Sequence, residues 1–437
     1  MDVSQIAATP GRYVALHTLR TVSAVNLNAG FDGQPKTMQL GGARRMRVSS
    51  QSTKRAMRSY ITTQINSDER ATRTRLIPQA VEDALPHVED SLYLAAVLLR
   101  ACGFKVDAKH PERVDITFMP RAAIPALARI VEENADLLRP FVATIKKDEA
   151  ATPAKKATAA AKKGETAASV VKGRIEQEVW AAFAPGANIE IALGGRMLTA
   201  LPEDSRHIGG AMAVAHAYTV DPMERIRDDW TTVDDWFDGG FTTAHKSGVA
   251  PGKGKAKNDA AGEGSGDDAE NTTSEDDDAE NTKGDAKGKT DTTTILGSGT
   301  LYQWAMLDRD QLRRNLAEGY TGDPATLEAA AVEAERLFIT AFTLAPASAK
   351  ARSTATGTLP DCVVALVSNQ PAHAVSCFRD PIPNDSPVVE EAANRIANYL
   401  TSVSNKYLTL NGGVVYWTPG TAIPAIPDFP ENLTVIQ

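Results

Sequence analysis

One internal segment, residues 246–294, limits what this 437-residue chain can fold into. From Pro251 onward the segment holds no aromatic residue and no Val, Ile, Leu, Met or Cys. Without apolar side chains it cannot bury enough surface to offset the loss of chain entropy on folding. The segment carries 7 Lys against 12 Asp and Glu, and so accounts for most of the chain's net charge of -8. We therefore predict a disordered low-complexity linker here, with folded parts before and after it.

The composition outside this segment is that of a soluble protein. Hydrophobic residues make up 42% of the chain, which is enough for a sizeable core, and the length suggests two to three domains. Cys102, Cys362 and Cys377 show no CxxC spacing, which excludes a disulfide scaffold and a thiolate zinc site. The first residues lack the pattern of a secretion signal, and no run has the length of a membrane span. These features predict a cytoplasmic protein without cofactor, metal site or membrane partner.

Strand and helix patterns alternate along the rest of the chain. Strands separated by helices, with hairpins between them, favour an α+β fold over a doubly wound parallel sheet. We expect strands over 12–19, 115–119, 189–193, 211–220, 300–306 and 363–368, and helices over 50–65, 92–101, 122–138, 170–184, 310–316, 325–342 and 388–403.

The most informative stretch is residues 36–58, which hold seven basic residues and no acidic one. Gly41-Gly42 permit a close approach of the backbone, and Ser49 or Ser50 is placed to cap the helix that follows. The first amide groups of a helix are unpaired and attract anions. One turn later, Lys54, Arg55 and Arg58 fall on one side. The pattern predicts a phosphate-binding surface more strongly than a solvated helix, which usually mixes both charge signs.

A second basic segment, 146–164, contains three Lys pairs in an Ala- and Thr-rich background. Its composition fits a solvated loop. It also fits a mobile basic arm that contacts phosphates without sequence preference.

Several blocks of this sequence resemble one family. In order along the chain they read LHTLRTVSAVNLN, GGARRMRVSSQSTKRAMR, IEIALGGRM, GGAMAVAHAYTV and DDWTTVDDWFD. The same blocks occur in this order in CasC-type backbone subunits of type I-E CRISPR Cascade complexes. The resemblance covers most of the chain apart from 146–164 and 246–294.

The resemblance implies a hand-like architecture. A ferredoxin-like palm of RNA-recognition type would carry a helical finger insertion and a thumb hairpin. The palm would begin with 12–60, including the RNA-binding helix; the fingers would be 61–187; palm strands with a thumb at 196–212 would occupy 188–245; the linker would be 246–294; and the palm would end with 295–437.

The resemblance also implies which residues bind the guide RNA. Carried over position by position, the grip comprises Asn28, Lys36, Gly41, Gly42, Arg44, Arg45, Arg47, Ser49, Ser50, Gln51, Lys54, Arg55 and Arg58. The thumb residues that would displace a base are Arg196, Met197, Arg206, His207 and Ile208.

The implied function is binding without cleavage. Several copies would stack along the guide RNA, present its bases to a target DNA strand, and contact the large, small and guide-end-binding Cascade subunits. Residues 36–58 contain no aromatic side chain, so recognition should use phosphate and sugar and be indifferent to sequence.

Three other interpretations compete with this one. Asp32 lies in the loop where type III relatives carry an Asp that supports metal-dependent RNA cleavage, although Asp-Gly is also a common turn pair. A structural filament protein without RNA would explain the strand and helix pattern but not the acid-free run. A metal site is conceivable in an acidic cluster, but alternating aromatic residues favour a helix with its acids in solvent; the cluster is Asp228, Asp229, Asp234, Asp235 and Asp238.

Overall fold

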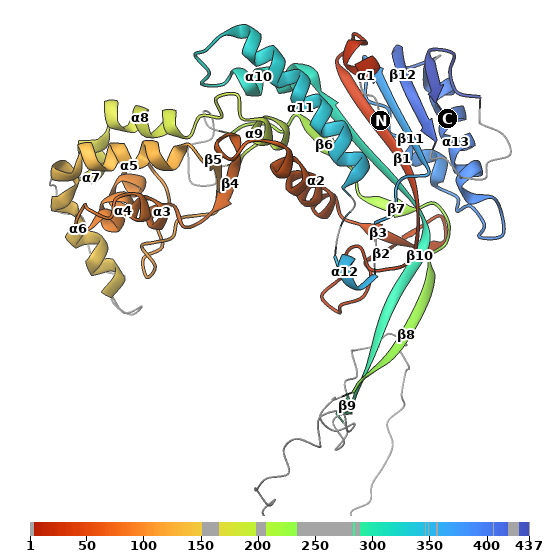
Figure 1. Cartoon of the computed structure of the whole chain (residues 1–437), viewed down its shortest axis with the longest axis horizontal. Helices are drawn as coiled ribbons and strands as arrows, with labels where there is room; N and C mark the ends of the chain where they lie inside the picture. Colours follow the sequence, from red (N-terminus) through yellow and green to blue (C-terminus); the bar gives the residue numbers. More distant parts are fainter. Residues whose placement is uncertain are drawn as a thin grey trace, which may run out of the picture.

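The computed structural model describes residues 4–150, 166–197, 207–233, 283–284, 289–345, 347, 349–354, 357–404, 406–417 and 428–436. Figure 1 shows three parts. A sheet with helices packed on it, called the sheet body below, contains both ends of the described chain. A separate helical body lies to one side. A two-stranded arm projects from the sheet.

The sheet body is built on strand β1, Tyr13–Val25, which pairs antiparallel with β10 on one side and β11 on the other. Residues 14–20 of β1 are all buried, so both faces of the sheet are covered at this point. The sheet order is β13-β12-β11-β1-β10-β7-β3-β2, and only the β12–β13 pair is parallel. The other strands are β2 Thr37–Leu40, β3 Ala43–Val48, β6 Met212–Val214, β7 Ala217–Thr219, β10 Lys289–Asp308, β11 Cys362–Ser368, β12 Leu410–Trp417 and β13 Leu433–Ile436.

Helices cover both faces of this sheet. One apolar core joins Leu16 of the sheet to Met57 and Phe338, and a second core joins Leu19 to Phe378 and Ile396. The helices of the sheet body are α1 Ser4–Ala8, α2 Ser50–Gln64, η1 Ser67–Glu69, α9 Ile189–Gly194, α10 Arg309–Ala317, α11 Pro324–Leu344, α12 Ala351–Thr354, η3 Ala374–Phe378 and α13 Val388–Ser404.

The helical body has a core of its own, in which Leu98, Ile130 and Phe183 are fully buried. It is joined to the sheet body through a small two-stranded sheet and the segment around α9 (Figure 1). Its elements are β4 Ala71–Thr74, α3 Ile77–Ala84, α4 Ser91–Ala101, β5 Thr117–Pro120, α5 Ala123–Glu133, α6 Ala135–Ala150, α7 Ala167–Val171 and α8 Arg174–Ala182.

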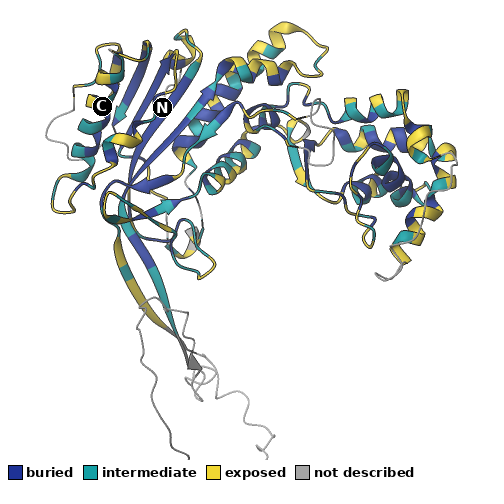
Figure 2. Cartoon of the chain, turned by 180° about the vertical axis from the view of Figure 1, so that it is seen from behind, coloured by how far each residue is buried: buried dark blue, intermediate teal, exposed yellow. Residues whose placement is uncertain are grey.

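The arm is an extension of β10. This strand has 20 residues and, at ~3.4 Å per residue, spans roughly 65 Å. Its second half lies in the sheet, whereas its first half pairs with β8, Glu224–Val233, and with β9, Lys283–Gly284, outside it. Figure 2 shows that the described residues of the arm are mostly exposed or half-buried. Residues 289–294, inside the expected linker, therefore belong to a strand.

The α+β class is confirmed, but four expected elements differ. Residues 189–193 form helix α9 instead of a strand, because Asn188 caps the helix by accepting from the Ile191 amide at 3.0 Å. The expected strand 211–220 is divided into β6 and β7. The expected helix 122–138 breaks at Asn134, and the helix 170–184 breaks at Gly173, where φ is +101°.

The expected acidic helix is also wrong. Asp228 and Asp229 lie in strand β8 opposite Thr294 and Thr293. Asp229 pairs with Arg227 at 3.1 Å. Asp234, Asp235 and Asp238 lie outside the described residues. Within the described ranges, no group of three His, Cys, Asp or Glu residues could hold a metal ion.

Candidate nucleic-acid interface

Helix α2 presents one apolar face and one basic face. Ser49 caps it as expected, since its side chain accepts from the Ser52 amide at 3.4 Å. Thr53, Met57 and Ile61 recur every four residues and are buried, and α2 packs against α11. This packing fixes the helix and leaves the opposite face to line a cleft.

The cleft has a volume of about 520 Å³ and lies where α2, α9 and the two-stranded β4–β5 sheet meet. From α2 it receives Gln51, Lys54, Arg55 and Arg58, a stripe with i, i+3, i+4, i+7 spacing. Arg73 of β4 adds a fourth cation. Within the described part of the chain, no ion pair joins these four cations to a carboxylate, so the cleft retains a positive charge suited to an anion.

Two of these arginines are held by one aromatic ring. Phe118, which pairs with Arg73 across the β4–β5 sheet, is buried. The guanidinium of Arg58 lies 5.7 Å from the centre of its ring and that of Arg73 lies 5.3 Å from it. Burial and the nearby charge of Arg73 lower the pKa of Arg58. Two cations brought together in this way bind a shared anion more strongly than either would alone.

Glu190 is the one carboxylate in the cleft lining, and its oxygens are occupied. It is buried, accepts from the Thr62 hydroxyl at 2.7 Å, and accepts from the Ala71 amide at 2.6 Å. Glu190 thereby ties α9 to α2 and to the β4–β5 sheet. Its role is to hold the two sides of the cleft at a fixed separation.

The N-terminus of α2 faces a polar cluster. The Asn28 side chain accepts from the Ser49 amide at 2.9 Å. His216, between β6 and β7, accepts through Nδ1 from the Ser50 amide at 3.3 Å and lies 3.4 Å from Arg47. Asn28, Arg47, Ser49 and Ser50 from the expected grip are therefore brought together here.

Three members of the expected grip have structural roles instead. Arg45 is completely buried, and its guanidinium donates to the carbonyls of Leu40, Thr219, Val220 and Arg379 at 3.1–3.2 Å. Gly41 and Gly42 form the turn between β2 and β3, with φ of +63° and +76°. A Cβ on Gly41 would lie 1.8 Å from the Arg379 carbonyl oxygen, so its close approach is to the chain itself.

Lys36 and Arg44 lie on the β2–β3 side. Lys36 is half-buried and Arg44 is exposed. Both hold neighbouring backbone: the Arg47 amide donates to the Lys36 carbonyl at 2.7 Å, and the Met223 amide donates to the Arg44 carbonyl at 2.9 Å. Their side chains do not line the cleft.

The expected thumb is described only at its base. Arg196 and Ile208 exchange two backbone hydrogen bonds of 2.8 Å. Residues 198–206, which include Arg206, lie outside the described residues. Met197 and His207 are exposed. Arg196 is buried, and it donates to the Phe183 carbonyl; burial lowers its pKa to about 10. Contrary to expectation, Arg196 is an internal link and is not available to a phosphate.

Asp32 occupies a turn. It is exposed, and its carboxylate accepts from the Gln34 amide at 3.1 Å. This arrangement matches the turn that Asp-Gly predicts.

Sequence reasoning missed Arg73, Phe118 and His216. The first two lie 15 or more residues beyond the basic run and reach it only through the β4–β5 pairing. No local pattern could have connected them. The sequence signal for His216 is a polar residue that interrupts an apolar strand pattern, and the structure shows that this residue is exposed.

Comparison with known proteins places this chain in a family. The chain belongs to the CT1975-like family of Cas proteins, and the family model matches residues 14–250 and 272–423. A search among curated proteins found no match. None of the helices in the described ranges has the length and apolar character needed to cross a membrane.

Two solved structures share the fold over nearly the whole chain. One, described as "CRISPR RNA-guided surveillance complex, pre-nicking", is 23% identical with a TM-score of 0.67, and the match covers 97% of this chain and 96% of that chain. The other, described as "CRISPR RNA-guided surveillance complex", is 21% identical with a TM-score of 0.59 and the same coverage.

Proposed function

We propose that this chain is a non-catalytic backbone subunit of a CRISPR RNA-guided surveillance complex. In this role it binds the phosphates of a guide RNA along α2. The observation that carries the proposal is the cleft in which Lys54, Arg55, Arg58 and Arg73 gather without an ion-paired carboxylate. The family and the descriptions of the two similar structures support the same function.

The chemistry of the cleft fits a backbone-binding subunit. Arginine and lysine recognise phosphate but carry no base information. Among the described residues, the only aromatic ring in the cleft lining is that of Phe118. It is buried and already contacts two guanidinium groups, so it is not available for base stacking. Guide binding is therefore indifferent to sequence, as required of a subunit that accepts any spacer.

The finer assignment is to the CasC-type backbone of type I-E Cascade complexes. This assignment rests on the five sequence blocks that resemble that family. The ferredoxin-like palm is part of the same proposal. Its partners are the guide RNA, a target DNA strand through guide pairing, neighbouring copies of the chain and the other Cascade subunits, in the prokaryotic cytoplasm. Segment 196–212 is proposed to cover the RNA held by the next copy. Arg196 anchors the start of this segment to the Phe183 carbonyl.

A salt titration tests the central proposal. The variant Lys54→Ala/Arg58→Ala should bind every guide more weakly by a similar factor and reduce the salt slope by about 0.7 per lost contact, as for a single strand. Lys172→Ala/Lys406→Ala, two cations away from the cleft, is the matched control. Strong preference among spacers of equal length, or an unchanged slope, would overturn the proposal.

Absorbance of the purified chain at 260 and 280 nm separates this function from a filament protein without RNA. Incubation of labelled RNA with Mg²⁺ separates it from a nuclease. Co-purified RNA that stays intact is the expected result.

A further inference from the structure

The loop between β1 and β2 is rigid up to its tip. Asn26 is fully buried and donates through Nδ2 to the Gly33 carbonyl at 2.7 Å. The Gly30 amide donates to the Gln34 carbonyl at 2.8 Å, and the Gly33 amide donates to the Gly30 carbonyl at 3.3 Å. Ala29 and Pro35 form a bridge below this turn. The tip, Phe31-Asp32, is thus held by a closed set of backbone bonds.

Phe31 at this tip has a relative exposure of 115%. The next most exposed large apolar side chains, Tyr407 and Met197, reach 78% and 74%. Single exposed apolar residues are common on proteins. A fully exposed phenyl ring on a hydrogen-bonded turn is different, because the fold holds it in solvent where it gains nothing from burial.

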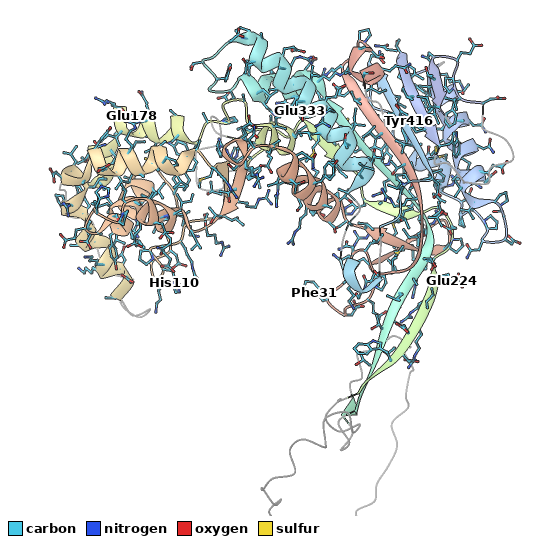
Figure 3. The ribbon with its side chains drawn as sticks, viewed as in Figure 1. Phe31, His110, Glu178, Glu224, Glu333 and Tyr416 are labelled. Carbon is cyan, nitrogen blue, oxygen red and sulfur yellow. The ribbon has the colours of Figure 1, made fainter. Side chains whose placement is uncertain are left out.

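The tip lies beside the phosphate-binding surface. Phe31 lies three positions after Asn28, so their Cα atoms are at most ~11 Å apart. Asn28 itself accepts from the Ser49 amide at the N-terminus of α2. Figure 3 shows Phe31 at the end of its loop, below α2 and on the side of the sheet body that faces the helical body.

The charge of the tip decides which part of a nucleotide it can meet. Asp32, next to Phe31, is exposed and repels phosphate. The bases of a strand whose phosphates are held at α2 and Arg47 are uncharged and offer flat faces. An aromatic side chain beside a basic surface is the arrangement that stacks unpaired bases without selecting among them.

We propose that Phe31 stacks on one base of the RNA strand whose phosphates are bound along α2. The inference rests on the proposed function, and it adds a base contact to a site otherwise limited to phosphate. The contact does not read sequence, because every base has a π-face. Each copy of the chain then fixes the position of one base relative to its own α2.

Binding to two single-stranded RNAs of equal length tests the inference. One RNA carries bases and the other is abasic, with the same phosphates. The full-length chain should bind the abasic RNA roughly tenfold more weakly. Phe31→Ala should bind the RNA with bases about as weakly as the unaltered chain binds the abasic RNA. Its affinities for the two RNAs should therefore differ little. Phe31→Trp should keep the difference.

Tyr407→Ala is the matched control. Tyr407 is an exposed aromatic residue preceding β12, near the opposite edge of the sheet from β2 and β3. This variant should behave as the unaltered chain does.

The outcomes distinguish the two proposals. If the unaltered chain binds neither RNA, the proposed function fails, and this inference fails with it. If it binds both and Phe31→Ala retains the full difference between them, stacking by Phe31 is overturned while phosphate binding stands. If Phe31→Ala binds both RNAs normally but no longer forms multi-copy assemblies on long RNA, Phe31 contacts another copy, which also overturns the inference.

Discussion

The basic run at residues 36–58 is divided by the fold into two regions with opposite uses of charge. In the β2–β3 hairpin, Arg45 is fully buried and saturated by carbonyls of its own chain. Ten residues later in α2, Arg55 is exposed over a cleft shared with three other cations. The comparison teaches that an acid-free run is not one surface: packing assigns some cations to the fold and leaves others for a ligand.

The strongest test of this contrast is Arg45→Ala. It takes a donor from the carbonyls of Leu40, Thr219 and Arg379, at a cost of about 1–3 kcal/mol for each group that water and other donors cannot reach. The Val220 carbonyl keeps the Ile382 amide at 2.9 Å. We expect a total loss of at least about 3 kcal/mol in the free energy of unfolding, measured by urea denaturation. Arg55→Ala should be within about 0.5 kcal/mol of the unaltered chain. A normally stable Arg45→Ala variant that fails to bind RNA would reverse the assignment.

Much of the fold was accessible from the sequence. Apolar periodicity and capping residues located α2, α4, α10, α11 and α13 close to their observed bounds. Short apolar segments were not decided locally: IEIAL alternates like a strand, yet Asn188 starts a helix there. The low-complexity composition of 246–294 predicted a linker, and residues 246–282 lie outside the described residues. That composition did not reveal that residues 289–294 pair with β8.

The candidate site was accessible in part. The stripe of Lys54, Arg55 and Arg58 follows from helical spacing alone. The burial of Arg45 does not, because its partners Thr219 and Arg379 are distant in sequence. Arg73 was missed for the same reason. Tertiary pairing decides which charges meet, and a single sequence carries no record of it.

The contrast between enclosed and open basic groups extends to histidine. His17 is fully buried in β1, with Nδ1 3.0 Å from the Tyr302 hydroxyl. Burial, reinforced by nearby His373, lowers its pKa to about 3. In the unfolded chain the pKa is ~6.5, so between these values the unfolded state binds the proton and the native state does not. Stability is therefore greatest above pH 6.5 and falls as the pH falls toward 3.

We expect a loss of about 2 kcal/mol from this group between pH 7 and pH 5, measured by urea denaturation at each pH. His17→Gln should flatten this acid dependence. His87→Gln, in which an exposed histidine paired with Glu132 is replaced, should leave it unchanged. The same slope in all three proteins would assign the acid sensitivity to other groups.

Arg73→Ala tests whether the open region extends beyond α2 into the helical body. The loss of one phosphate contact should weaken RNA binding by about three- to tenfold and reduce the salt slope by about 0.7, as for a single strand. Arg129→Ala, which removes an exposed cation of the helical body paired with Glu133, is the matched control. Equal effects of the two variants would mean that only net charge matters. No effect of Arg73→Ala would confine the interface to α2.

The smallest effect is expected from shortening the low-complexity segment, residues 246–294. Because β10 begins at Lys289 and β9 is Lys283–Gly284, a deletion that respects the arm removes only residues 246–282. Each halving of a loop changes its closure free energy by only about 0.6 kcal/mol, in the stabilising direction. The shortened chain should match the original in urea denaturation, RNA affinity and assembly on long RNA. If assembly is lost while stability and RNA affinity are unchanged, residues 246–282 contribute a contact between copies. The charged residues of this segment would then have a function in addition to those of the basic run at 36–58.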